Sequence, residues 1–324
     1  VANTEGQFNV AMGRRAGYVN TTGDYNNALG YLTLYANTTG SNNIAVGYQA
    51  LYANTTASNN TAVGNAALAA NTTGTQNVAV GALALDANTT GNNNIGIGYH
   101  SNSATTTGAN NVAVGAEALD ANTTADNNTA IGTFALGANT TGTYLTAVGT
   151  YALDANTTAN SNTAVGYNAL TGNTTGHSNT AVGVTALGNS TTSNANTAVG
   201  YLALLANTTG HSNTAVGSEA LDANTTGNYN TAMGFQALTA CTTGERNVAI
   251  GRTAMQAATT TIKNVAVGMD ALGVMVTGDG YNTAIGNAAS AANTTGSYNV
   301  SLGASAMAAA TTADQTVCIG YNAG

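Results

Sequence analysis

The chain has 324 residues, of which 43% are hydrophobic and only 6% are charged, with no Pro or Trp and a formal net charge of −8 at pH 7. This composition excludes a highly charged disordered segment, and five scattered cations form no basic stripe, so we expect no nucleic-acid partner. No apolar run approaches the ~18 residues that a transmembrane helix needs, so we expect no membrane insertion in this segment.

One motif recurs along the whole chain. A glycine that follows a small residue and a bulky aliphatic residue stands at Gly13 and then at every seventeenth position up to Gly268. One extra residue precedes Gly286, after which the same spacing resumes and ends at Gly320. We therefore predict one continuous array of nineteen repeats over residues 1–324 rather than several globular domains.

The three residues before each glycine predict a short strand. The last is always a bulky aliphatic residue, the first is β-branched in every repeat except at Asn27, and the middle one is Ala in sixteen repeats. Such residues favour strands at 44–47, 61–64, 78–81 and the equivalent positions. Since both faces are apolar or minimal, we expect a strand buried on both sides. The aliphatic face would lie inside the coil, and the tiny face would allow close approach of a second backbone.

The segment after the glycine predicts a second strand and a turn. It contains Ala-Leu in most repeats, as at Ala50 and Leu51, where Leu would fill the interior opposite the first strand. An Ala-Asn-Thr-Thr-Gly run follows, rich in residues that tolerate tight turns. Two short strands and two turns within one repeat indicate an all-β, parallel β-solenoid or β-roll and exclude a helix.

The small apolar core of each coil predicts association between copies of the chain. Nineteen coils at ~4.8 Å each would give a rod of roughly 90 Å. Each coil has only about three large apolar side chains, so a single copy would have a meagre core, and association would remedy it.

The Asn-Thr-Thr turns match the acceptor pattern for N-glycosylation. Twelve repeats contain the turn intact, and the candidate sites are Asn20, Asn37, Asn54, Asn71, Asn88, Asn122, Asn139, Asn156, Asn173, Asn207, Asn224 and Asn293.

The second Thr of the turn persists even where Asn is replaced. It is retained at Thr107, Thr192, Thr243, Thr260, Thr277 and Thr312. This Thr therefore has a role of its own, and we weigh two: a buried hydroxyl ladder in the turn or an O-glycan site.

Catalytic and metal sites are poorly supported. His177 and His211 share one repeat position but lie two coils apart, about 10 Å, with no partner at metal-ligand spacing. Asp86, Asp120, Asp154 and Asp222 also share a position, which would give a broken calcium ladder or, as we favour, solvated turn residues. We expect no enzyme, no metal and no cofactor. Cys241 and Cys318 lie about 20 Å apart in a solenoid, too far for a disulfide.

The repeat is irregular between residues 241 and 281. This stretch contains Arg246, Arg252 and Lys263, three of the five cations, together with the inserted residue. Val274, Met275 and Val276 replace the usual Ala-Asn-Thr. An apolar group on a turn can mark a surface contact, although neutral divergence of one coil, which we favour, explains it as well.

The repeated phrase resembles a known family. The segments NNIAVG (42–47), NNVAVG (110–115) and NVAIG (247–251) resemble the head repeats of trimeric autotransporter adhesins of the YadA type, and similar arrays occur in bacteriophage tail-fibre proteins. The resemblance implies a left-handed parallel β-roll with three chains about a threefold axis. It would place strands such as 44–47 toward that axis, with Ala45, Ala62 and Ala79 permitting close chain contact. The period is longer here than is usual in that family.

These observations predict an extracellular, non-enzymatic fibre segment on a virion or cell surface, forming a homotrimer or filament. Its role would be reach and attachment, with variable residues such as Tyr48, Tyr99, Tyr167 and Tyr201 meeting surface carbohydrate or a host receptor. The alternatives are a glycan-coated self-assembling filament and a monomeric ice- or glycan-binding solenoid. Ice binding is disfavoured because the Thr pair is adjacent in a turn, not two apart on a strand. The start at Val1 indicates a mature or partial chain.

Overall fold

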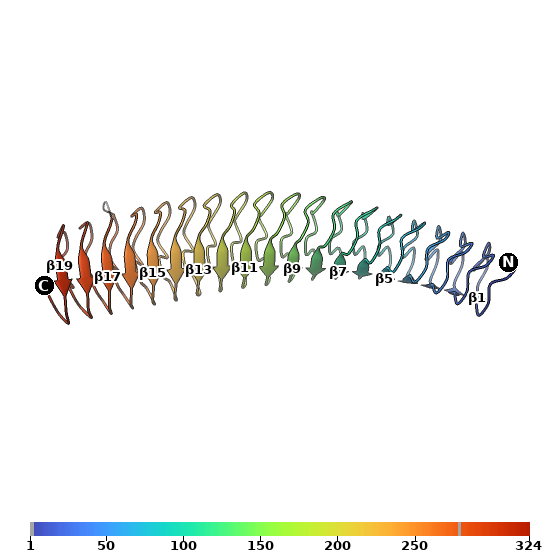
Figure 1. The fold of residues 1–324 in the computed structure, drawn as a ribbon, viewed down its shortest axis with the longest axis horizontal. Coiled ribbons are helices and arrows are strands. Elements are labelled where there is room, and N and C mark those ends of the chain that lie inside the picture. Colours follow the sequence, from blue (N-terminus) through green and yellow to red (C-terminus); the bar gives the residue numbers. More distant parts are fainter. Residues whose placement is uncertain (1–2, 278–279) are drawn as a thin grey trace. The chain divides into compact units, whose positions relative to one another are not determined.

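The chain is an all-β, parallel β-solenoid in which each repeat forms one coil with a single strand (Figure 1). The structure is a computed structural model that describes residues 3–277 and 280–324. The chain forms two compact units, residues 1–161 and 162–324. Nothing in the described residues is helical.

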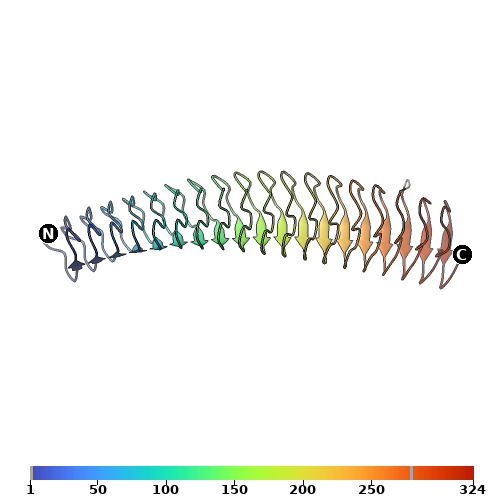
Figure 2. The ribbon, with the colours of Figure 1, turned by 180° about the vertical axis from the view of Figure 1, so that it is seen from behind.

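Every coil contributes one strand of three residues at the same place in the repeat, as the view from behind also shows (Figure 2). The strands of the first unit are β1 (Val10–Met12), β2 (Asn27–Leu29), β3 (Ile44–Val46), β4 (Thr61–Val63), β5 (Val78–Val80), β6 (Ile95–Ile97), β7 (Val112–Val114), β8 (Thr129–Ile131) and β9 (Thr146–Val148). The second unit contains β10 (Thr163–Val165), β11 (Thr180–Val182), β12 (Thr197–Val199), β13 (Thr214–Val216), β14 (Thr231–Met233), β15 (Val248–Ile250), β16 (Val265–Val267), β17 (Thr283–Ile285), β18 (Val300–Leu302) and β19 (Val317–Ile319).

Consecutive strands within each unit pair in parallel with an unchanged register. Ala45 lies opposite Ala62, which in turn lies opposite Ala79. The inserted residue does not disturb this pattern, because Val265 of β16 still pairs with Thr283 of β17. The extra residue is accommodated in the connection between these two strands. Identical positions of successive coils therefore form straight columns within each unit.

The prediction of a second strand in each coil is wrong. The Ala-Leu segment is a bend in which Leu takes a left-handed backbone conformation, with φ of 51° at Leu51 and 55° at Leu204. A residue in this conformation cannot continue a strand. The Leu side chain still has its predicted place, since Leu51 and Leu204 are fully buried.

The strand faces are reversed relative to the prediction. The Ala side chains, including Ala45, Ala62 and Ala79, point inward and are fully buried, so they do not offer a surface to a second chain. The aliphatic and β-branched residues on either side of each Ala point outward and are half-buried or exposed. At the Ala position of each strand, the interior has room for little more than a methyl group. A Cβ added at Gly96, which stands in the Ala column, would lie 3.0 Å from the Ser101 carbonyl oxygen and 3.1 Å from Cγ of Leu85.

Two columns of buried Asn complete the interior, one directly before the strands and one in the Asn-Thr-Thr turns. The residue before most strands is Asn, and its Oδ1 accepts a hydrogen bond from the backbone N–H of the Asn one coil later, as Asn60 does from Asn77 at 2.9 Å. Its Nδ2 donates to the carbonyl of a turn residue, at 2.9 Å from Asn60 to Gly74. Buried polar groups need such partners, so these ladders satisfy the backbone of a coil that is too narrow for a larger apolar core.

Candidate interaction surface

The outward residues of the strands form a continuous uncharged face in each unit, with one aliphatic column and one column of Val, Ile, Thr and a single Asn. We call this the outer strand face, and it consists of the first and third residues of every strand. The third residue is Val, Ile, Leu or Met in all nineteen strands, and none of these outward residues is charged. Because strands repeat every ~4.8 Å and the two columns lie ~7 Å apart along each strand, the face is a regular two-column array.

The outer strand face leaves large aliphatic side chains in contact with solvent in a single chain. Ile131 in the first unit is 40% exposed, and Met233 in the second is 41% exposed. Thr occupies the first column in five consecutive coils of the second unit, from Thr163 in β10 to Thr231 in β14. Contiguous apolar patches of more than about a few hundred Å² on a soluble protein mark interaction sites. Sequence patterning located this strand but could not tell which face would be outside.

The twelve Asn predicted as glycosylation sites are brought together as interior columns. Each is at most 5% exposed. Asn37 is typical: its Nδ2 donates to Oδ1 of Asn20 at 2.8 Å and to the Gly40 carbonyl at 2.9 Å, while its Oδ1 accepts from Nδ2 of Asn54 at 2.8 Å. The nitrogen that would bear a glycan is thus engaged inside the folded coil. Glycosylation stays a prediction, and the geometry gives these Asn a structural role.

The hydroxyl ladder exists, but it uses the first Thr of the turn. Oγ1 of Thr38 donates to the carbonyl of Thr55 at 3.1 Å, and Oγ1 of Thr55 donates to that of Thr72 at 3.1 Å. The second Thr, for which the sequence suggested a buried ladder, is exposed, as at Thr56 and Thr107. The ladder interpretation is therefore wrong for that residue, and the O-glycan alternative remains untested.

The predicted contact at 274–276 is divided between surface and interior. Val274 and Val276 are 44% and 42% exposed, whereas Met275 is fully buried. Met275 occupies the column that Asn fills elsewhere, and its Sδ accepts a hydrogen bond from Nδ2 of Asn282 at 3.7 Å. Only the two Val side chains offer a surface.

The other titratable candidates do not converge on a reactive centre. In the described part of the chain, no three His, Cys, Asp or Glu side chains are placed to hold a metal ion. Asp120 lies 4.0 Å from Nδ1 of His100 and accepts a hydrogen bond from Oγ of Ser103. Cys241 and Cys318 are free thiols, as predicted, and burial raises the pKa of Cys241 to about 11.

No helix among residues 3–277 and 280–324 is long and apolar enough to cross a membrane.

Stacked aromatic side chains form columns that were not predicted from the sequence. The rings of Tyr18 and Tyr35 stack at 5.6 Å, and those of Tyr35 and Tyr52 stack at 5.3 Å. In the second unit, Tyr281 and Tyr298 stack at 5.0 Å. The signal was present in the sequence, since each pair is separated by one repeat. These rings are placed by the coil spacing, which is close to the distance at which aromatic rings stack.

The fold and the outer strand face together define a β-solenoid repeat protein with an unpartnered apolar face in the single chain. No protein-family model matches the sequence, and no curated protein matches it significantly.

Proposed function

We propose that the chain is a shaft or head segment of an extracellular fibre in which copies associate side by side through the outer strand face. Three copies are the expected number, from the resemblance to trimeric adhesin repeats. The function is mechanical reach and surface attachment, as in a phage tail fibre or a bacterial adhesin. The observation that carries this proposal is the uncharged face, with an aliphatic column that continues through every coil of each unit.

The size of the face supports association with further copies. Nine strands in the first unit and ten in the second give faces of about 40 and 50 Å in length, each roughly 10 Å wide. The summed area of the two faces is about 900 Å² per chain, which is comparable to the ~800 Å² per partner of a standard stable interface.

The experiment is the native mass of the purified chain compared with its denatured mass. A native mass of three times 31.8 kDa is expected. Val199→Glu places a charge in the outer strand face and should shift the native mass toward one chain. Thr209→Glu is the matched control in the same coil, on an exposed turn residue, and should leave the native mass unchanged. A wild-type chain that is monomeric at micromolar concentration would overturn the proposal.

A second candidate function is ice binding by a single chain. The outer strand face has Thr and an aliphatic residue two apart on one strand, and this is repeated from β10 to β14. Their hydroxyl and methyl groups point the same way at regular intervals, an arrangement that could order water. Thermal hysteresis of a monomeric sample, abolished by Thr197→Lys and not by Thr209→Lys on an exposed turn, would favour this function. The absence of hysteresis would eliminate it.

A further inference from the structure

One column of the second unit combines aromatic and cationic side chains in five successive coils. The residue two positions before the strand is Tyr229, Arg246, Lys263, Tyr281 and Tyr298 for β14 to β18, and we call this set the aromatic–cationic column. It contains two of the five cations of the whole chain. The three Tyr side chains are 44–51% exposed, and the Arg246 side chain is 54% exposed.

The backbone holds these residues at a fixed spacing. The N–H of Arg246 donates to the Asn228 carbonyl at 3.0 Å, and the N–H of Lys263 donates to the Glu245 carbonyl at 2.9 Å. All five residues have left-handed backbone conformations, with φ between 57° and 60°. Each side chain therefore leaves the coil at the same kind of bend, and successive members are separated by the coil rise of ~4.8 Å.

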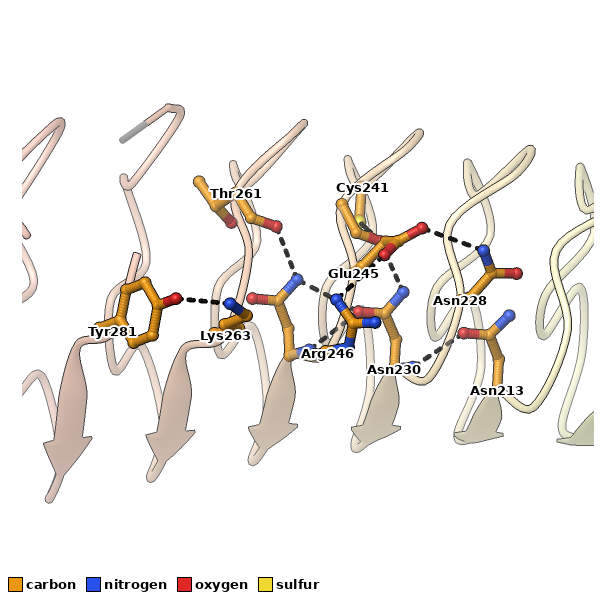
Figure 3. A network of polar contacts seen from close by, with 11 residues as sticks. Asn213, Asn228, Asn230, Cys241, Glu245, Arg246, Thr261, Lys263 and Tyr281 are labelled. Carbon is orange, nitrogen blue, oxygen red and sulfur yellow. Dashed lines mark hydrogen bonds and ion pairs between the residues drawn. The ribbon is translucent and has the colours of Figure 1, made fainter. Parts of the chain in front are cut away.

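The side chains are organised along the column. Cζ of Arg246 lies 5.6 Å from the centre of the Tyr229 ring, and Nζ of Lys263 lies 4.6 Å from the centre of the Tyr281 ring. Lys263 also donates a hydrogen bond to the hydroxyl of Tyr281 (Figure 3). The ring of Tyr298 stacks on that of Tyr281 at 5.0 Å. At least one face of each Tyr ring is thus covered by a cation or by another ring.

The charges of the column are incompletely neutralised. Nη1 of Arg246 lies 3.5 Å from Oε2 of Glu245, an exposed pair. Among the described residues, no carboxylate pairs with Lys263. Like charges at facing positions of adjacent strands or coils are unfavourable. Arg246 and Lys263 are directed toward Tyr229 and Tyr281 on opposite sides, and an anionic chain laid along the column would contact both cations.

We propose that the aromatic–cationic column binds an acidic polysaccharide, with the sugar chain parallel to the column. A uronate chain carries one carboxylate per sugar, so a short segment offers a carboxylate to each of the two cations. The carboxylates would pair with Arg246 and Lys263, because charge-assisted hydrogen bonds are the strong ones. The sugar hydroxyls would contact the hydroxyl groups of the flanking Tyr residues.

A nucleic acid suits the column less well. Two cations would neutralise few phosphates, and the phosphate contacts supply most of the affinity for nucleic acids. The stacked rings also leave few free faces for bases. This inference rests on the attachment role proposed above, since it names the partner. Its test is separate, because binding is measured on the purified chain whatever its native mass.

The experiment measures binding of a fluorescent oligogalacturonate to the full chain by anisotropy. Binding is expected, and it should weaken strongly when salt rises from about 0.02 to about 0.3 M, because screening acts on exposed charges. The fully methyl-esterified oligomer, which has the same sugars without charge, should bind at least about tenfold more weakly. A thymidine oligonucleotide of equal length should also bind more weakly.

Substitutions test whether Arg246 and Lys263 bind the polysaccharide. Arg246→Gln combined with Lys263→Gln should weaken binding about tenfold. Gln is tolerated in this place, since Gln76 and Gln315 occupy the same repeat position. Arg252→Gln, which removes a cation outside the column, should change affinity less than about twofold. No binding at millimolar oligomer, equal binding of the ester or the oligonucleotide, or an unchanged affinity of the double variant would each overturn the inference. A monomeric native mass with retained binding would reject the trimeric fibre alone.

Discussion

Replacing Gly200 by Ala should open the solenoid locally. Gly200 directly follows strand β12 and has a φ of 138°, a conformation that costs a residue with a side chain about 1–3 kcal/mol. A Cβ at this position would lie 2.4 Å from the carbonyl oxygen of Gly217 and 2.6 Å from its carbonyl carbon. The neighbouring coil would have to move away.

That movement would break ladder hydrogen bonds on both sides. The N–H of Gly200 donates to Val182 and that of Gly217 donates to Val199, both at 2.8 Å. Each bond contributes about 1 kcal/mol, so the total cost of Gly200→Ala is about 3–5 kcal/mol. Because the coils interact only with their neighbours, the loss should be confined to residues near β11–β13.

Hydrogen exchange measured by mass spectrometry is the appropriate assay. Peptides that cover residues 180–217 should exchange at least about 100-fold faster in Gly200→Ala, while distant peptides are unchanged. Gly188→Ala is the control in the preceding coil, because a Cβ there would first meet the side chain of Thr185, and Ala69 occupies the same repeat position. Similar protection in both variants would refute the argument that the glycine after each strand is required by backbone contact.

Three further predictions concern the interior of the coil. Leu204→Ala should lower stability by about 2–5 kcal/mol in denaturant unfolding, whereas Leu205→Ala, at a half-buried position, should cost clearly less. Asn207→Leu should be destabilising by at least about 2 kcal/mol in the same assay, because it removes the acceptor for Nδ2 of Asn224. The pKa of Cys241 is raised from 9.0 to about 11, so its neutral form is favoured in the folded state. Stability should therefore be constant below pH 9 and fall by about 2–3 kcal/mol as the pH rises to 11, and Cys241→Ala should flatten this profile.

The strand positions could be predicted because they depend on local chemistry and exact repetition. β-branched residues around a small residue, followed by glycine, favour a strand wherever they occur, and the observed strands Ile44–Val46 and Thr61–Val63 lie within the predicted ranges. The constant period also required coils stacked in register, because each coil then offers the next an identical partner.

Other features depended on the width of the coil, which no local pattern reports. Alternation along a strand separates two faces but does not say which one is inside. The inside face is Ala because the opposite Leu already fills the interior, as the close contacts at Gly96 indicate. For the same reason the Ala-Leu segment bends instead of forming a second strand, and Leu51 adopts a positive φ.

The sequence by itself determined the period, the strand and the buried Leu of this protein. Only the tertiary structure decided that the aliphatic columns face outward, that the Asn side chains lie in the interior, and that the Ala-Leu segment is a bend. The physical reason is that stacking places residues of different coils side by side, so their contacts depend on the path of the backbone around each coil.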